Sequence, residues 1–159
     1  MYIEKYWENY IGGTDDSLTL LEYLAGKQKK EISLQEIFAD AGLDKMNGEF
    51  KETEELSLPM DGFDADIYYA IDLIGDLAAL LLECKVSGSV KLSELWEYGV
   101  GEGCEICITA TPEEHEMMNK ALSDFVSAPM EYDLSEMVDE EDMSEMAEIC
   151  EELRKELYG

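Results

Sequence analysis

The chain has 159 residues, 46% of them hydrophobic, which suffices for a single folded domain over residues 1–159 with a substantial core. Its 39 acidic residues outnumber 11 basic ones, and the net charge of −28 excludes binding to nucleic-acid phosphates or anionic membrane surfaces. No run approaches the ~20 apolar residues that cross a bilayer, and the start, MYIEKYWENYIGG, lacks a signal peptide's apolar segment, so we expect a cytoplasmic protein.

The N-terminal third predicts three helices. The first shows the apolar spacing of one helical face, ends at Gly12-Gly13, and presents Ile3, Tyr6, Trp7, Tyr10 and Ile11. The second begins after Thr14 or Asp15, stops near Gly26, and turns inward Leu18, Leu21 and Leu24. An S-x-x-E capping box at residues 33–36 opens the third, which ends at Gly42.

The middle of the chain predicts four strands, near residues 55–60, 65–74, 77–86 and 104–110. The first alternates weakly and holds a proline, and the second is rich in β-branched and aromatic residues. The third, LAALLLECKV, is a nearly continuous apolar run typical of a central buried strand, although a buried helix gives the same pattern. We read Gly75-Asp76 as the turn that separates the second strand from the third.

Two helices follow the strands. Thr111-Pro112-Glu113-Glu114 combines a threonine cap, a proline in the first turn and a glutamate that closes a capping box, so a helix should run to about residue 126. Residues 140–158 predict a docked amphipathic helix, because its apolar stripe consists of Met143, Met146, Ala147, Cys150, Leu153 and Leu157. Helices, strands and helices in this order favour an α+β fold with an antiparallel sheet of about four strands.

Residues 131–153 contain eleven carboxylates and no lysine, arginine or histidine. A helix face that is simply solvated would explain part of this charge. A protein that needed only solubility could intersperse lysines, however, and the one-signed field favours electrostatic attraction of a basic partner. The carboxylates that we predict to contact lysines and arginines of that partner are Glu136, Asp139, Glu140, Glu141, Asp142, Glu145 and Glu148.

No motif predicts a catalytic site, a cofactor or a metal. Cys104 and Cys107 form a CxxC, but no second pair follows, so we expect free thiols rather than a zinc site. His115 is the only histidine, and no third group or oxyanion motif accompanies it and Cys107. The chain has no P-loop, no GxGxxG and no GxSxG.

The stretches WENYIGGTDDSLTLLEYL (7–24) and ITATPEEHEMMNKAL (108–122), with the acidic C-terminal helix, resemble immunity proteins of bacterial polymorphic and contact-dependent toxin systems. The resemblance implies neutralisation of a cognate toxin, often a basic nuclease, by stoichiometric binding. It carries over no individual functional residue. Together these observations predict a non-enzymatic acidic protein that blocks a basic partner. The alternatives are a small carboxylate-dependent hydrolase and an acidic interaction domain, either a nucleic-acid mimic or a housekeeping protein.

Overall fold

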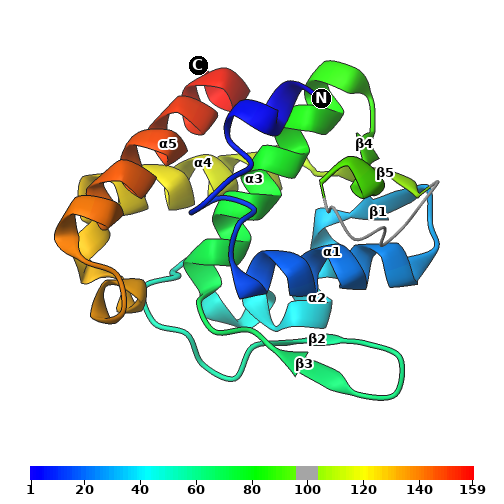
Figure 1. The fold of residues 1–159 in the computed structure, drawn as a ribbon, viewed down its shortest axis with the longest axis horizontal. Coiled ribbons are helices and arrows are strands. Elements are labelled where there is room, and N and C mark those ends of the chain that lie inside the picture. The colour runs from blue at the N-terminus through cyan, green and yellow to red at the C-terminus, as the bar shows by residue number, and fades with distance from the viewer. Residues whose placement is uncertain (96–103) are drawn as a thin grey trace.

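The computed structural model describes residues 1–95 and 104–159, and it is a mixed α+β fold built around one central helix (Figure 1). This helix, α3 (Ala70–Ser87), is contacted by α1 (Asp15–Lys27), α4 (Pro112–Ser127), α5 (Glu140–Tyr158) and the short 3-10 helix η1 (Tyr2–Lys5). The remaining α-helix of the described residues, α2 (Leu34–Ala41), packs against the first strands. Four more 3-10 helices are η2 (Leu43–Met46), η3 (Leu92–Glu94), η4 (Pro129–Glu131) and η5 (Asp133–Glu136).

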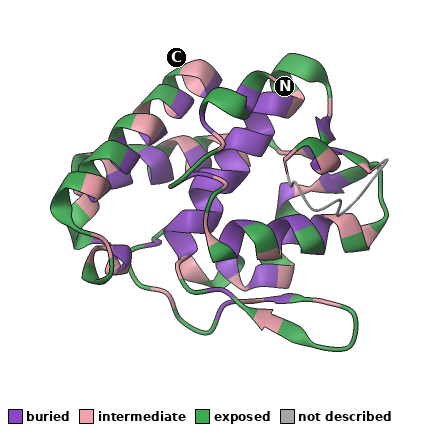
Figure 2. Ribbon diagram, viewed as in Figure 1, coloured by how far each residue is buried: buried purple, intermediate pink, exposed green. Residues whose placement is uncertain are grey.

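The strand predicted at residues 77–86 is wrong, and most of the strand predicted at 65–74 is wrong too, because α3 occupies both. Every residue from Ala70 to Glu83 is buried, and Figure 2 shows α3 in the colour of buried residues along most of its length. A helix that meets core on every side loses the period of 3.6, so its sequence is a continuous apolar run.

Gly75 and Asp76, which were predicted to form a turn, lie inside α3 and contact the N-terminal segment. A Cβ atom on Gly75 would lie 2.6 Å from Ile11 Cδ1, so glycine lets the two segments approach closely. Asp76 accepts hydrogen bonds from Gly12 N at 2.8 Å and Ser17 Oγ at 2.6 Å. Tertiary contacts therefore explain why glycine and aspartate occupy these two positions, and the local sequence pattern does not reveal such contacts.

The strands form two small sheets in place of the predicted single sheet. The predicted strands near 55–60 and 104–110 are confirmed as β2 (Ser57–Pro59) and β5 (Glu105–Thr109). β2 pairs antiparallel with β3 (Asp64–Asp66) in a hairpin of its own. β5 lies between β4 (Val90–Lys91), which is antiparallel to it, and β1 (Glu31–Ser33), which is parallel. The parallel strand β1 was missed, because three residues beside a helix cap carry no periodic signal.

The first 11 residues do not form the predicted helix. After η1 the chain turns, and Glu8 and Ile11 form an isolated β-bridge. The burial of Ile3, Tyr6 and Ile11 nevertheless agrees with the predicted apolar face. The predicted start of α1 after Thr14 or Asp15 is confirmed, with Thr14 as the cap, but Leu18 is 39% exposed rather than turned inward.

The two C-terminal helices are confirmed nearly as predicted. Thr111 and Glu114 form a complete capping box at the start of α4. Asp139 caps α5, with its side chain accepting from Asp142 N at 2.9 Å. All six residues of the predicted apolar stripe of α5 are buried against α3 and α4. Within residues 1–95 and 104–159, no helix combines the length and apolar content that crossing a membrane requires.

Candidate partner-binding surface

The structure brings the seven predicted carboxylates together at the N-terminal half of α5. Glu136 ends η5, Asp139 caps α5, and the other five lie on the first turns of α5. Six of the seven residues are exposed and Asp142 is half-buried. A wide surface depression on this part of α5 is lined by Asp139, Glu140, Glu141, Ser144, Glu145 and Glu148. We call the seven carboxylates the α5 acidic surface.

Helix chemistry explains part of this surface. The first turn of α5 holds Glu140, Glu141 and Asp142, where negative charge is favoured by the positive end of the helix dipole. Glu145 and Glu148 lie beyond the first turn, where this benefit has faded. Glu145 follows Glu141 by four residues and Glu148 follows Glu145 by three, spacings at which like charges on a helix repel. Local stability therefore does not account for these two residues.

The α5 acidic surface has no cationic partner in the described part of the chain. Eight ion pairs form there, and none of them includes any of the seven carboxylates. The cations of α5 lie at its other end, where Arg154 binds Glu151 at 2.6 Å. That hydrogen bond lowers the pKa of Glu151. The negative charge of the N-terminal half is thus left uncompensated.

Tyr10 belongs to this surface, and the sequence reading missed it. Its hydroxyl donates to Asp142 Oδ1 at 2.7 Å and lies 3.1 Å from Glu145 Oε2. The hydrogen bond to Asp142 raises the pKa of Tyr10. The helical spacing of the first residues had assigned Tyr10 to the core face, and only the tertiary fold shows that its hydroxyl reaches α5. Tyr10 supplies a neutral donor that holds two carboxylates in place.

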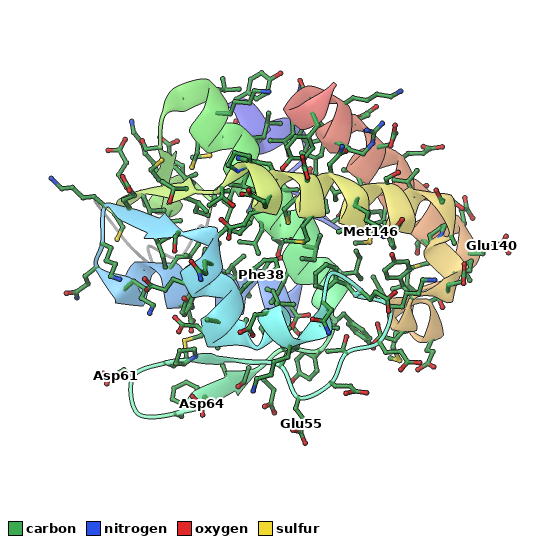
Figure 3. The ribbon with its side chains drawn as sticks, turned by 180° about the vertical axis from the view of Figure 1, so that it is seen from behind. Phe38, Glu55, Asp61, Asp64, Glu140 and Met146 are labelled. Carbon is green, nitrogen blue, oxygen red and sulfur yellow. The ribbon has the colours of Figure 1, made fainter. Side chains whose placement is uncertain are left out.

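Carboxylates also lie on other faces, so the α5 acidic surface does not hold all the excess charge. Figure 3 labels Glu55 in the segment before β2 and Asp61 and Asp64 in the β2–β3 hairpin, with Glu140 at the opposite end of the molecule. A groove beside η2 holds four glutamates of residues 49–55, but Lys45 and Lys51 line it too. Its charge is therefore partly compensated, unlike that of α5.

Three aspartates with raised pKa values lie in the interior rather than in a reactive cavity. Burial raises the pKa of Asp72 to about 8 and that of Asp76 to about 7, and it also raises the pKa of Asp16. Carboxyl groups with raised pKa values are typical of acid–base catalytic sites. Each of these three residues, however, is at most 3% exposed to solvent. Asp16 accepts from Tyr68 N and Tyr69 N at the start of α3. These carboxyl groups join α1, α3 and the N-terminal segment, and no substrate could touch them.

The thiols and the histidine show no arrangement for nucleophilic chemistry. Cys84, Cys107 and His115 line one small cavity, where His115 Nδ1 lies 2.9 Å from the Tyr158 hydroxyl. Burial raises the pKa of Cys84 to about 12, which disfavours the reactive thiolate. Among the described residues, no group of three or more histidine, cysteine or acidic side chains has the geometry to hold a metal ion.

The family described as Immunity protein 68 matches residues 2–157, which is nearly the whole chain. Searches of the curated proteins and of the solved structures found no match.

Proposed function

Because this chain belongs to the Immunity protein 68 family, we propose that it neutralises a toxin by binding it, with no catalytic step of its own. The toxin is a basic protein, and it meets the α5 acidic surface. Binding takes place in the cytoplasm of the producing cell and occludes the toxin's working surface. The observation that carries this proposal is the group of seven carboxylates that form no ion pair with a lysine or arginine of the described chain.

Long-range attraction is the physical advantage of such a surface. Complementary charge raises association rates from ~10⁵–10⁶ toward ~10⁸–10⁹ M⁻¹s⁻¹ at low salt. Fast capture matters for an inhibitor that must reach its toxin before the toxin reaches its substrate. A nuclease-type toxin fits this scheme best, because a protein that binds phosphates must carry clustered lysine and arginine.

Charge reversal tests the proposal on the toxin encoded in the same operon. The variant carries Glu136→Lys, Glu145→Lys and Glu148→Lys, which all lie outside the first turn of α5 and so leave its dipole interactions intact. We expect its association rate at low salt to fall at least ~10-fold. Rapid-mixing fluorescence or surface plasmon resonance would measure that rate.

A matched control separates position from net charge. Glu22→Lys, Glu94→Lys and Glu116→Lys change the net charge equally, and these exposed residues lie in α1, η3 and α4. The control should slow association much less than the α5 variant. If both variants slow it equally, net charge rather than the α5 acidic surface governs capture. If neither does, electrostatic capture is the wrong explanation.

A further inference from the structure

The most exposed large hydrophobic side chain among the described residues lies in the segment that carries Glu136 and Asp139 of the α5 acidic surface. Met137 is 75% exposed, and it sits between Glu136 and Asp139 in the chain. Met130, 45% exposed, belongs to the same connection between α4 and α5. Single exposed hydrophobic residues are common on protein surfaces. Here two methionines share one short connection, and carboxylates flank the more exposed one.

We infer that Met137, supported by Met130, is the apolar anchor of the toxin-binding surface and inserts into an apolar pocket that lysines and arginines surround on the toxin. The inference rests on the proposed function and names the contact that decides affinity. Interfaces draw most of their binding energy from a few apolar anchors enclosed by a polar rim that excludes water. Methionine suits this role because its unbranched, polarisable side chain adapts to an irregular pocket.

The connection that carries the two methionines is held firmly to the body of the protein. Tyr132 is 3% exposed, and its ring packs edge-to-face on Phe125 with the centroids 4.9 Å apart. Leu134 is buried as well. Asp133 N donates to Lys51 O at 2.8 Å, and Asp133 Oδ2 accepts from Thr53 N at 2.9 Å.

The two methionines are fixed from within the connection too. Ser135 Oγ donates to Met130 O at 3.1 Å, and Met137 N donates to Leu134 O at 3.0 Å. The backbone under both side chains is therefore hydrogen-bonded within the connection before binding. A preorganised anchor loses little conformational entropy in the complex, so more of the contact energy appears as affinity.

The charge around Met137 identifies the kind of partner. A metal ion or a polyamine would use the carboxylates and gain nothing from the methionine. A protein with a basic surface and an apolar pocket uses both. Tyr10 favours the same occupant, because it holds Asp142 and Glu145 in place at the rim and limits their freedom to collapse onto a small cation.

Two probes test this inference, the toxin encoded in the same operon and poly-L-lysine, which offers positive charge without a pocket. Met137→Ala should weaken toxin binding ~10- to 100-fold, mainly through faster dissociation, because burying such a side chain accounts for an effect of that size. The same variant should bind poly-L-lysine as the wild type does. Met137→Leu should restore most of the toxin affinity.

The control is Val86→Ala, because Val86 is 52% exposed near the C-terminal end of α3 and lies in no acidic surface. This variant should bind both probes normally. Toxin binding by Met137→Ala at the wild-type affinity would overturn the anchor and leave the proposed function standing. A loss of both toxin and poly-L-lysine binding would overturn it too. If the wild-type protein does not bind the toxin, the proposed function and the anchor fail together.

Discussion

The buried aspartates contribute stability that is lost as pH rises, opposite to the usual behaviour of carboxylates. The pKa of Asp76 is about 7 in the folded protein, against an ordinary value of 3.8. The pKa of Asp72 is about 8 for the same reason, burial, with the charge of Asp76 adding to it. At pH values between the ordinary pKa of 3.8 and the raised pKa values, the folded chain keeps these two carboxyl groups protonated, whereas the unfolded chain has released their protons. The contribution of these two groups to the free energy of unfolding is therefore fully present below about pH 4 and is lost as pH rises toward about 8.

Asp76→Asn isolates the contribution of one group. One proton held only by the folded state lowers the free energy of unfolding by about 1.4 kcal/mol per pH unit, so Asp76 alone removes about 2 kcal/mol between about pH 5 and about pH 7. The asparagine Oδ1 can still accept from Gly12 N, and its amide can donate to Ser17 Oγ. The variant should match the wild type near pH 5 and exceed its stability near pH 7.

Urea unfolding at several pH values, followed by far-UV circular dichroism, measures both slopes. Glu22→Gln is the matched control, because Glu22 is an exposed carboxylate on α1 and its loss should leave the slope unchanged. Equal pH slopes in the wild type and in Asp76→Asn would refute the reasoning. That result would mean that Asp76 is ionised in the core and compensated by a contact other than those described here.

Three further changes test packing and capping by equilibrium unfolding. Gly75→Ala puts a methyl group 2.6 Å from Ile11 Cδ1 and should lower the free energy of unfolding by about 1–3 kcal/mol. In the control, Gly26→Ala, the methyl group meets no atom within 4 Å, so this change should be neutral or stabilising. Equal effects of the two changes would contradict the close approach of Gly75 and Ile11. Thr111→Ala removes the side-chain cap of α4 and should cost about 1 kcal/mol, with faster amide exchange in the first turn; unchanged exchange would argue against the cap. Met146→Ala, at a position 1% exposed, should cost about 2–5 kcal/mol, and a cost under about 1 kcal/mol would mean that α5 is loosely docked.

Local signals predicted the flanking helices well, because their causes lie within a few residues. The side chains of Thr111 and Glu114 each accept a hydrogen bond from the other residue's backbone N–H. This signal for a helix start depends only on residues three positions apart. The apolar stripe of α5 has one buried side and one solvated side, so its period survives in the sequence. Because only one side of α5 is buried, its helical period could be recognised in the sequence.

The central helix and the N-terminal segment were mispredicted for the same reason, since tertiary contacts determine both. α3 is buried on all sides and has no period to read. Gly12 adopts φ +83°, and a Cβ atom there would lie 2.2 Å from the ring of Trp7. The glycine thus lets the indole cover the turn, and it does not mark the end of a helix. The pairing of β1 with β5 joins segments about 75 residues apart, which no local pattern encodes.

The candidate surface was predictable only in its charged part. Seven carboxylates in a run without cations are visible in the sequence, and the structure places all seven at one end of α5. Tyr10 comes from a distant segment and was assigned to the core. Met137 lies inside the predicted run, but its neighbours Leu134 and Met143 are buried, and only the fold shows which apolar side chains of the region face solvent.

The carboxylates of this protein fall into three groups that differ in what they reveal about function. Those paired with cations, such as Glu151 with Arg154, and those buried with raised pKa values, such as Asp76, have a structural explanation. The first-turn residues of α5 have a partial one in the helix dipole. Glu136, Glu145 and Glu148 have none, because they are exposed, form no ion pair within the described chain and lie outside the favourable first turn. A fold selected for stability alone would gain from a lysine at position 145, which could pair with Glu141, or at position 148, which could pair with Glu145. A cationic partner explains the presence of acids at these positions, and this is why the reversal of these three charges tests the proposed function most directly.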